Sequence, residues 1–533
     1  AGVTNNTNTN DLDQYQLNGT WYNENSGALS SINFGVSNTS IDFRATSANS
    51  GQLAAGWWTK SADWYDDGLF TRVDSSGLLD GFSGGGSDKL INYYYDADFD
   101  KIVAVAQSIN CDHPDAGLGA CTWPADVNGR VQAGPIDDDH RVSEKTLAFY
   151  AQANFETEFN NMPVNISAGL RYEKTDVTAN SLERPAVNME WVNGNEWSYI
   201  YAQERSFSNG EGSSSEFLPN IDMNIEVAQD VLARFSYSRS LARPPVGALR
   251  STTSFIGNPK VGQRKVTVGN PNLKPYTADN LDLSLEYYYG EGSYVSAGYY
   301  RKQVENFLVN VTTEETLAGI TDAFIGERAE QAREDRLAEG VQPTDQAIHD
   351  KINENRGETD GTAIAGDNTD PLASFFVSRD NNVETANIWG WELAAQHMFA
   401  DSGFGVAANA TFVFGDVAAD RDATGYQFAL PGLSDSANIS AIYDLDGLSA
   451  RISYNWRDEF LTGFDQHSSP VFTESYGQWD INVNYAVNPK LTVFIEALNI
   501  TDETQRTYVR YSEQLLRANQ YGARYNLGFR YSF

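Results

Sequence analysis

The sequence predicts an all-β protein, an antiparallel β-barrel that crosses a membrane with its strands. Three observations predict this fold class. Apolar and polar side chains alternate over many segments of the 533 residues, as they do where a strand shows one face to lipid and the other to a lumen. The connections between these segments alternate between short and long. Aromatic residues are abundant, with 28 Tyr, 27 Phe and 11 Trp, as in barrels that place them at both membrane interfaces.

The C-terminal segment shows the alternation most clearly. Its odd positions are apolar or aromatic: Tyr521, Ala523, Tyr525, Leu527, Phe529, Tyr531 and Phe533. Its even positions are small or polar: Gly522, Arg524, Asn526, Gly528, Arg530 and Ser532. Successive side chains of a strand point to opposite faces. One face of this strand is therefore apolar and suited to lipid.

The same alternation predicts about fifteen strands along the chain. They begin near Tyr15, Leu29, Lys145, Val164, Glu216, Val231, Tyr276, Ser293, Thr385, Phe404, Leu433, Gly447, Ser475, Lys490 and Gln520. Short turns are predicted at residues 25–27, 160–163, 229–230, 290–292, 401–403, 444–447 and 488–489. Long loops are predicted at residues 45–144, 179–214, 242–275, 311–384, 417–432, 459–474 and 501–519. Short periplasmic turns and long extracellular loops are typical of outer-membrane barrels, so we expect a periplasmic C-terminus.

The largest loops carry two further expectations. We treat residues 1–533 as one barrel domain, with 45–144 and 311–384 as its large extracellular loops. The segment 320–355 is rich in Ala, Glu, Arg and Gln, which predicts one or two helices on the outer surface.

The number of strands predicts that the barrel is incomplete in this chain. Single-chain bacterial barrels have an even number of strands, and fifteen is odd. The first strand must run from outside to inside for the turns to alternate correctly. We therefore expect an odd number of strands before Ala1, where no signal peptide is visible either.

Composition excludes several classes of protein. No run approaches the roughly 20 apolar residues of a membrane helix. The 37 basic and 72 acidic residues give a formal charge of −35, which argues against a nucleic-acid partner. The acidity is explained either by a heavily solvated surface or by loops that bind cations or divalent-bridged lipopolysaccharide.

A series of motifs over roughly residues 230–533 resembles a known family. They are Ser238-Arg239-Ser240-Leu241-Ala242-Arg243-Pro244, Gly269-Asn270-Pro271-Asn272-Leu273-Lys274-Pro275-Tyr276, Ile388-Trp389-Gly390-Trp391-Glu392-Leu393, Asn455-Trp456-Arg457-Asp458-Glu459-Phe460, Glu496-Ala497-Leu498-Asn499-Ile500-Thr501-Asp502 and the terminal Phe533. In this order, they resemble the C-terminal part of a TonB-dependent outer-membrane receptor. The spellings are most similar to a subgroup often tied to carbohydrate uptake.

The resemblance implies a fold and a mechanism. The fold is a 22-stranded barrel filled by an N-terminal plug, and 22 minus 15 leaves seven strands, again an odd number. Loops capture a scarce nutrient, the plug occludes the pore, and TonB pulls on the plug using the inner-membrane proton-motive force. The implied partners are outer-membrane lipid and lipopolysaccharide, the TonB complex and a small-molecule ligand. We expect the barrel to be monomeric. Asn270 to Pro275 is implied to be a structural entry into a strand.

Two aromatic groups are the candidate ligand-binding residues. Trp57, Trp58, Trp64 and Tyr65 lie among aspartates in the first long loop. Aromatic rings pack against the C–H face of a sugar while carboxylates accept hydrogen bonds from its hydroxyls. The alternative is that this loop packs on itself. Trp191 and Trp197 belong to a second group, for which extension of a strand above the membrane is the stronger alternative.

The remaining motifs give little chemistry. Cys111 and Cys121 predict a small disulfide loop, with a metal clip through His113, Asp112 or Asp115 as the alternative. The run from Asp137 to His140 is expected to be a solvated acidic turn, with a divalent-ion site as the alternative. We find no catalytic motif, so we expect neither an enzyme nor a cofactor.

Three hypotheses for function follow. The first is energised nutrient import, with an oligosaccharide favoured over a ferric siderophore. The second is a passive porin. The third is an enzymatic barrel, for which the sequence offers no nucleophile.

Overall fold

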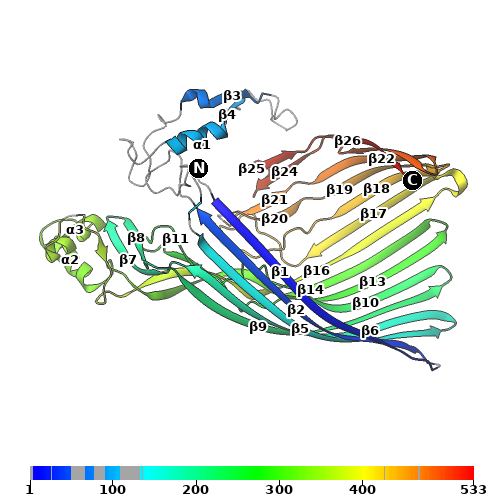
Figure 1. Cartoon of the computed structure of the whole chain (residues 1–533), viewed down its shortest axis with the longest axis horizontal. Coiled ribbons are helices and arrows are strands. Elements are labelled where there is room, and N and C mark those ends of the chain that lie inside the picture. Colours follow the sequence, from blue (N-terminus) through cyan, green and yellow to red (C-terminus); the bar gives the residue numbers. More distant parts are fainter. Residues whose placement is uncertain are drawn as a thin grey trace.

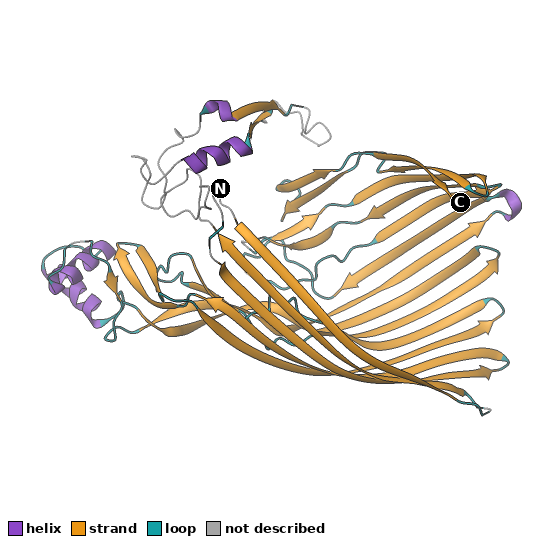
Figure 2. Cartoon of the chain, in the orientation of Figure 1, coloured by secondary structure: helices purple, strands orange, loops and turns teal. Residues whose placement is uncertain are grey.

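One large antiparallel sheet forms the body of the molecule (Figures 1 and 2). The computed structural model describes residues 4–25, 27–49, 66–76, 91–108, 133–134, 136–359, 361–424, 427–465 and 468–533. The sheet has 17 strands, two of which, β11 (Thr253–Ile256) and β12 (Lys265–Val268), belong to a connecting loop. The other fifteen follow one another round the sheet in chain order, each paired with its neighbour in sequence. The predicted number of strands is confirmed.

The fifteen strands have the following bounds: β1 (Thr4–Tyr22), β2 (Leu29–Asn49), β5 (Ile136–Phe159), β6 (Met162–Glu183), β9 (Ser206–Ala228), β10 (Val231–Ala242), β13 (Tyr276–Gly290), β14 (Ser293–Thr321), β16 (Leu372–Met398), β17 (Phe404–Gly415), β18 (Ser436–Leu445), β19 (Leu448–Arg457), β22 (Tyr476–Asn488), β23 (Leu491–Leu498) and β26 (Arg524–Tyr531). Within the described residues, β1 pairs only with β2 and β26 only with β23, so these two strands are the margins of the sheet.

The short turns gather at one end of the sheet, together with the C-terminus (Figure 1). Their residues adopt the left-handed conformations that tight hairpins need. Asn160 and Asn161 have φ of 50° and 62°, and Asp446 and Gly447 have φ of 51° and 79°. Two consecutive positive φ values are typical of type I′ turns, whose twist matches that of the flanking strands. The predicted alternation of short and long connections is confirmed.

Several strands are longer than predicted. β5 begins at Ile136 instead of near Lys145, β14 runs to Thr321, and β16 begins at Leu372. The predicted loops 45–144 and 311–384 are therefore too long. A membrane crossing needs only about 9–11 residues per strand. Beyond the membrane neither face of a strand meets lipid: Val142 of β5 and Phe375 and Val377 of β16 are buried against loop residues. The alternation between lipid and lumen therefore no longer marks these parts in the sequence.

The two faces of the sheet differ in chemistry. Cross-strand register places Phe149, Val36, Tyr172 and Phe217 on one face, and this face continues to Leu527 and Phe529 in β26. Many of these side chains are exposed, with Phe217 at 62% and Leu527 at 81%. The opposite face carries Asn, Gln, Ser, Glu and Arg. The apolar face suits lipid and the polar face a lumen, as in transmembrane barrels.

The long connections fold into separate structures at the other end (Figure 2). A lobe combines β7 (Ala186–Asn193), β8 (Glu196–Tyr201) and β15 (Ile364–Ala365) with α2 (Glu327–Ala338) and α3 (Asp345–Arg356). Both helices lie in the segment predicted to be helical. A second sheet contains β20 (Phe460–Phe464), β21 (Pro470–Thr473), β24 (Thr504–Val509) and β25 (Leu515–Gln520).

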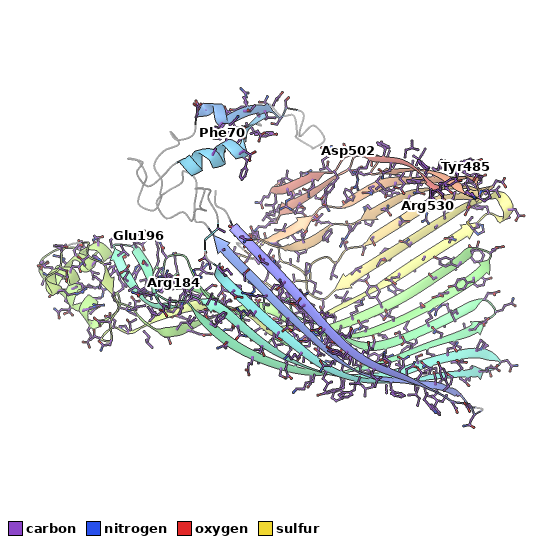
Figure 3. The ribbon with its side chains drawn as sticks, in the orientation of Figure 1. Phe70, Arg184, Glu196, Tyr485, Asp502 and Arg530 are labelled. Carbon is purple, nitrogen blue, oxygen red and sulfur yellow. The ribbon has the colours of Figure 1, made fainter. Side chains whose placement is uncertain are left out.

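A hairpin and a helix come from the first long loop: β3 (Phe70–Asp74), β4 (Tyr93–Ala97) and α1 (Phe99–Ser108). Phe70 of this hairpin and Glu196 of the helical lobe lie in different loop structures, while Tyr485 and Arg530 lie toward the turn end of the sheet (Figure 3). Among the described residues, no helix is both long and apolar enough to cross a membrane.

Candidate functional site

Neutral amides line the polar face of the C-terminal strands. Asn438 of β18, Asn455 of β19 and Gln478 of β22 lie directly opposite one another in the register of the three strands. Asn438 donates to Asn455, and the amides of Asn455 and Gln478 both donate to Asp480, at 3.0 and 2.8 Å. Further along, the amides of Asn482 and Asn526 donate to Glu496 at 3.2 and 3.5 Å. We call this surface the amide wall.

The amide wall combines donors and acceptors with little net charge. Each amide offers two N–H donors and a carbonyl acceptor, so it pairs with a hydroxyl in either sense. Only two carboxylates, Asp480 and Glu496, belong to the network just described, and each accepts from two amides. Such a surface suits uncharged polyhydroxylated solutes, and it also suits bound water.

The polar face of the N-terminal strands is covered by the loop between β10 and β13. Arg243 reaches from this loop to Glu144 of β5 and Glu173 of β6, both at 3.4 Å. It also donates to the Thr146 hydroxyl at 3.0 Å. Burial raises the pKa of the Glu144 carboxyl, and the Arg243 guanidinium opposes that effect. Leu249 and Leu273 of the loop pack against Val142 of β5 and Val177 of β6.

Two glycines of β9 let this inward loop approach the sheet. A Cβ at Gly212 would lie 2.2 Å from the carbonyl oxygen of Pro271, and one at Gly210 would lie 2.5 Å from the Pro271 ring. The loop also contributes β12 (Lys265–Val268), which pairs in parallel with residues 376–379 of β16. The inferred structural role of the Asn270–Pro275 stretch agrees with this packing.

Exposed aromatic side chains gather on the β3–β4 hairpin. Tyr94 and Tyr95 are 52% and 62% exposed, and Phe99 at the start of α1 is 71% exposed. The Arg72 guanidinium lies 3.9 Å from the centre of the Tyr93 ring, which fixes the third tyrosine. The Tyr93-Tyr94-Tyr95-Asp96 run was not among the residues predicted from the sequence. The sequence feature that could have indicated it is three consecutive tyrosines followed by an aspartate in a predicted loop.

The predicted aromatic residues separate into two cases. Trp57, Trp58, Trp64 and Tyr65 lie outside the described residues, in the same long loop as the hairpin. Trp191 and Trp197 are buried, at 0% and 3% exposure, in the core of the helical lobe. Their rings stack 5.4 Å apart against Phe324 and His349. This placement differs from the expected ligand contact, because neither ring has a free face.

The core of the helical lobe contains polar groups as well. His349 donates a hydrogen bond from its Nε2–H to the Trp191 carbonyl oxygen at 3.2 Å. Arg264 and Asp322 form a buried ion pair at 2.7 Å, with the guanidinium 5.3 Å from the Trp197 ring centre. The burial of Trp191 and Trp197 has a local reason: β7 and β8 form a hairpin, extended by β15, whose inner face the helices cover.

The acidic run lies in a strand and not in the expected turn. Asp137 to His140 belong to β5, so successive side chains point to opposite faces. Asp139 is held by Arg44 and Arg141 at 2.9 and 2.6 Å, and Asp137 pairs with Arg205. The two guanidinium groups lower the pKa of Asp139 well below its ordinary value. The four residues therefore do not converge on an ion.

Cys111 and Cys121 lie outside the described residues. No cluster of metal-binding side chains occurs among the described residues.

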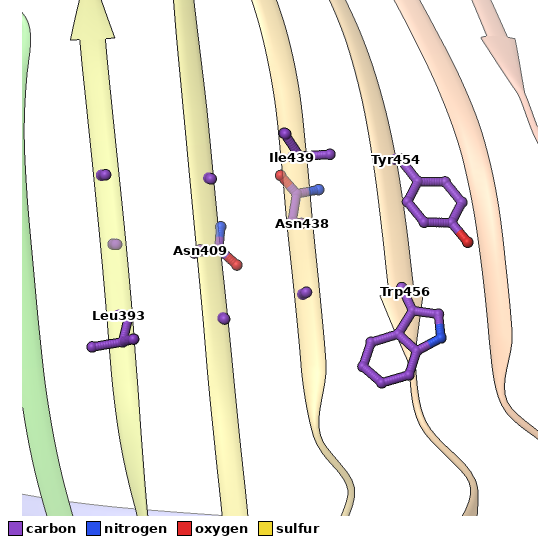
Figure 4. Close-up of a pocket in the computed structure, with 11 residues that line it drawn as sticks. Leu393, Asn409, Asn438, Ile439, Tyr454 and Trp456 are labelled. Carbon is purple, nitrogen blue, oxygen red and sulfur yellow. The ribbon is translucent and has the colours of Figure 1, made fainter.

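A cavity of about 550 Å³ lies on the apolar face of β16 to β19 (Figure 4). Alanines at 395, 408, 410 and 437 form its floor, and Leu393, Ile439, Tyr454 and Trp456 surround them. Register places these side chains on the same face as Phe404 and Ile452. The cavity therefore opens toward lipid and not toward the lumen.

Comparison with known proteins gives one family. The family described as TonB dependent receptor-like, beta-barrel, matches residues 1–500. No curated protein matches the sequence significantly. Among solved structures, the ferric citrate transporter FecA in its unliganded form is 11% identical with a TM-score of 0.50, over 99% of this chain and 55% of that chain.

Two other structures give similar values. The ferric yersiniabactin uptake receptor FyuA from Yersinia pestis is 12% identical with a TM-score of 0.49, over 100% of this chain and 55% of that one. The Ferric-Catecholate import receptor Fiu from K12 E. coli is 12% identical with a TM-score of 0.49, over 99% and 55%. The chain thus spans little more than half the length of these proteins. At such identities the likeness to FecA concerns the fold alone.

Proposed function

Because the chain belongs to the TonB-dependent receptor β-barrel family, whose members are receptors and transporters of the outer membrane, we propose that it imports a scarce nutrient, an oligosaccharide being the favoured ligand. Import is energised by TonB, which acts from the periplasm through a plug domain. The short turns and the C-terminus face the periplasm, and the long loops face outward.

The amide wall carries the preference for a neutral sugar. A site that hydrogen-bonds hydroxyl groups needs donors and acceptors in fixed positions, and Asn438, Asn455, Gln478 and Asn482 provide both. The charge of the chain supports the same choice. At −35, its field disfavours the approach of anionic ferric chelates and has little effect on neutral sugars.

In this proposal, the first long loop binds the oligosaccharide above the membrane. Tyr94 and Tyr95 are exposed beside Asp96 on the hairpin, and Trp57, Trp58, Trp64 and Tyr65 belong to the same loop. Aromatic faces and carboxylates together suit sugar rings. Trp191 and Trp197 are not part of this proposal, because they lie in the core of the helical lobe.

A ferric siderophore is the competing ligand, as the names of the similar solved structures suggest. Growth and uptake assays distinguish the oligosaccharide from the ferric siderophore. They use a strain in which the gene is deleted, with maltodextrins as the carbon source or ferric chelates as the iron source. We expect the deletion to remove saturable oligosaccharide uptake and to leave iron uptake intact. Loss of iron uptake alone would overturn the sugar proposal.

The site itself is tested with matched variants. Tyr94→Ala combined with Tyr95→Ala is expected to weaken oligosaccharide capture about tenfold, as for loss of one or two good aromatic contacts. Tyr22→Ala is the control, because Tyr22 is 70% exposed but lies beside a short turn at the opposite end of the strands. Equal affinity in all three proteins would exclude the hairpin from capture.

A further inference from the structure

We propose that a polar pocket at the loop end of β1, β2 and β5 binds one ring of the imported oligosaccharide through its hydroxyl groups. The pocket has a volume of about 210 Å³. Its polar side chains are those of Asn6, Asn8, Ser47, Asp138, His140 and Arg250. We call it the hydroxyl pocket. The proposal rests on the proposed import of an oligosaccharide, and the pocket lies on other strands than the amide wall.

The register of three strands brings most of these side chains together. Asn8 of β1 and His140 of β5 lie in one row of directly opposite residues, on either side of β2. In the row nearer the loops, Ser47 lies between Asn6 and Asp138. Figure 1 shows this end of β1 and β2 at the opposite end of the sheet from the short turns. In the proposed orientation, the pocket therefore lies on the extracellular side of the membrane.

The inward loop between β10 and β13 supplies Arg250. The next residue anchors this part of the loop to β9. The Ser251 hydroxyl donates to the Ser208 carbonyl oxygen at 3.1 Å, and the Ser208 hydroxyl donates to the Ser251 carbonyl oxygen at 2.5 Å. His140 lies an odd number of residues from Phe149 of the apolar face, so it belongs to the polar face that the loop covers. The loop thus holds Arg250 beside the strands.

Polar groups without a partner occur in the hydroxyl pocket. The Nδ1 atom of His140 and the Nε atom of Arg250 are buried, and neither has a hydrogen-bond partner among the described residues. Within the same part of the chain, Arg250 forms no ion pair, not even with Asp138 of the same pocket. A free arginine is unexpected where 72 acidic residues accompany 37 basic ones. Buried groups without a partner destabilise a fold, so a polar ligand toward which these side chains turn explains why they are kept.

The charges of the pocket favour an uncharged ligand. Burial lowers the pKa of His140, and the Arg250 guanidinium lowers it further, while Asp138 and Asp139 oppose both effects. His140 is therefore neutral near pH 7. The charges of Arg250 and Asp138 cancel, so an anion would meet the carboxylate and a cation the guanidinium. A hydroxyl group is donor and acceptor at once, so it can accept from Arg250 and donate to Asp138.

The size and lining of the pocket suit a single sugar ring. A water molecule takes up about 30 Å³ of the liquid, so 210 Å³ corresponds to about seven waters. None of the described residues that line the pocket is Phe, Tyr or Trp, so the ring is held by its hydroxyl groups and not by stacking. A site that hydrogen-bonds hydroxyl groups strongly rejects a ligand that lacks them. We therefore expect this pocket to distinguish one sugar from another.

The test measures binding to the purified receptor by isothermal titration calorimetry, with maltohexaose, cellohexaose and mannohexaose as neutral probes. Arg250→Gln is expected to weaken binding of the tightest probe by about 10- to 100-fold, as for loss of a charged hydrogen-bond donor. Arg205→Gln is the matched control, because it removes the same charge from the partner of Asp137, on the opposite face of β5. Its affinity is expected to equal that of the intact receptor.

A second measurement needs no variant that folds. Phenylglyoxal modifies arginine side chains, and mass spectrometry of the digested receptor identifies the modified residues. A saturating concentration of the tightest probe is expected to slow the modification of Arg250 and to leave that of Arg205 unchanged.

The outcomes separate the hydroxyl pocket from the proposed function. If the intact receptor binds a probe and Arg250→Gln binds it equally well, or if the bound probe leaves the modification of Arg250 unchanged, the pocket is overturned while oligosaccharide import stands. Tighter binding of the acidic probe trigalacturonate, lost in Arg250→Gln, would overturn the neutral class of ligand. Absence of binding of every probe to the intact receptor would contradict the proposed function, and the pocket with it.

Discussion

Single residues decide where the chain comes close to itself. Gly212 admits the carbonyl of Pro271, and Asn160 and Asn161 adopt the positive φ that a two-residue turn needs. The turn was predictable, because asparagine pairs between alternating segments are a strong local signal. The glycine contact was not, since it joins residues about sixty positions apart that no periodicity links.

Gly212→Ala is expected to destabilise the packing of the inward loop by about 1–3 kcal/mol, as for overpacking of a tight contact. The cause is the 2.2 Å approach that a Cβ would make to the Pro271 carbonyl oxygen. Limited proteolysis of the 243–275 loop measures the effect. Gly247→Ala is the control within the same loop, because a Cβ there meets no atom within 4 Å. Equal cleavage of both variants would contradict the assigned packing.

Asp139→Asn is expected to lower the thermal midpoint at pH 7. Arg141 and Arg44 hold the pKa of Asp139 below its ordinary value of 3.8, so its charged form stabilises the fold above that pH. This stabilisation is lost as the pH falls below about 4, and the two proteins should then converge. Thermal unfolding across pH measures the difference. Asp138→Asn, which removes the neighbouring carboxylate on the opposite face of β5, is the control.

At the scale of elements, the sequence predicted strands better than loops. Leu281, Leu283 and Leu285 alternate with polar residues because lipid and lumen select opposite side chains, and this part of β13 was recognised. The upper part of β5, from Ile136 to Glu144, was not, because it lies beyond the lipid and its inner face packs against the loop between β10 and β13, at Val142 for example. The burial of Trp191 and Trp197 was not predictable for a related reason. A loop that builds its own core uses the same aromatic residues as a loop that binds sugar.

Trp191→Ala is expected to cost the helical lobe about 3–5 kcal/mol, as for truncation of a buried tryptophan. The side chain is fully buried against Trp197, Phe324 and His349. Hydrogen exchange should show faster exchange in α2 and α3 and unchanged protection in β10 and β13. Leu337→Ala, on an exposed site of α2, should leave exchange unaltered. Unchanged exchange in Trp191→Ala would mean that the lobe has another core.

At the scale of the whole molecule, the two faces of the sheet determine where the protein can reside. Fifteen strands share one apolar surface, and the register joins it from Leu17 in β1 to Phe529 in β26. Sequence alternation was sufficient to predict this property. It was not sufficient for the amide wall, because the hydrogen bonds from Asn455 and Gln478 to Asp480 depend on a register that spans three segments.

Leu527→Arg is expected to reduce the amount of folded receptor in the outer membrane. Leu527 is 81% exposed on the apolar face, and a lipid-facing Arg costs about 2–4 kcal/mol near the midplane. The heat-modifiable, folded fraction in isolated outer membranes measures the outcome. Asn526→Arg, one residue away on the polar face, should assemble normally. Equal assembly of the two variants would contradict the assignment of the faces.

The strands have unequal lengths, so one part of the sheet extends further than the rest. β14 and β16 have 29 and 27 residues, whereas β18 and β19 have 10 each. At about 3.3 Å per residue, the longer strands reach roughly 60 Å further along their own direction. The extra length of β14 and β16 consists of paired strands. Their backbone is already ordered in the folded protein, so this surface is stiff. On the proposed function, a long solute that touches this stiff surface would search for the lumen in two dimensions instead of three.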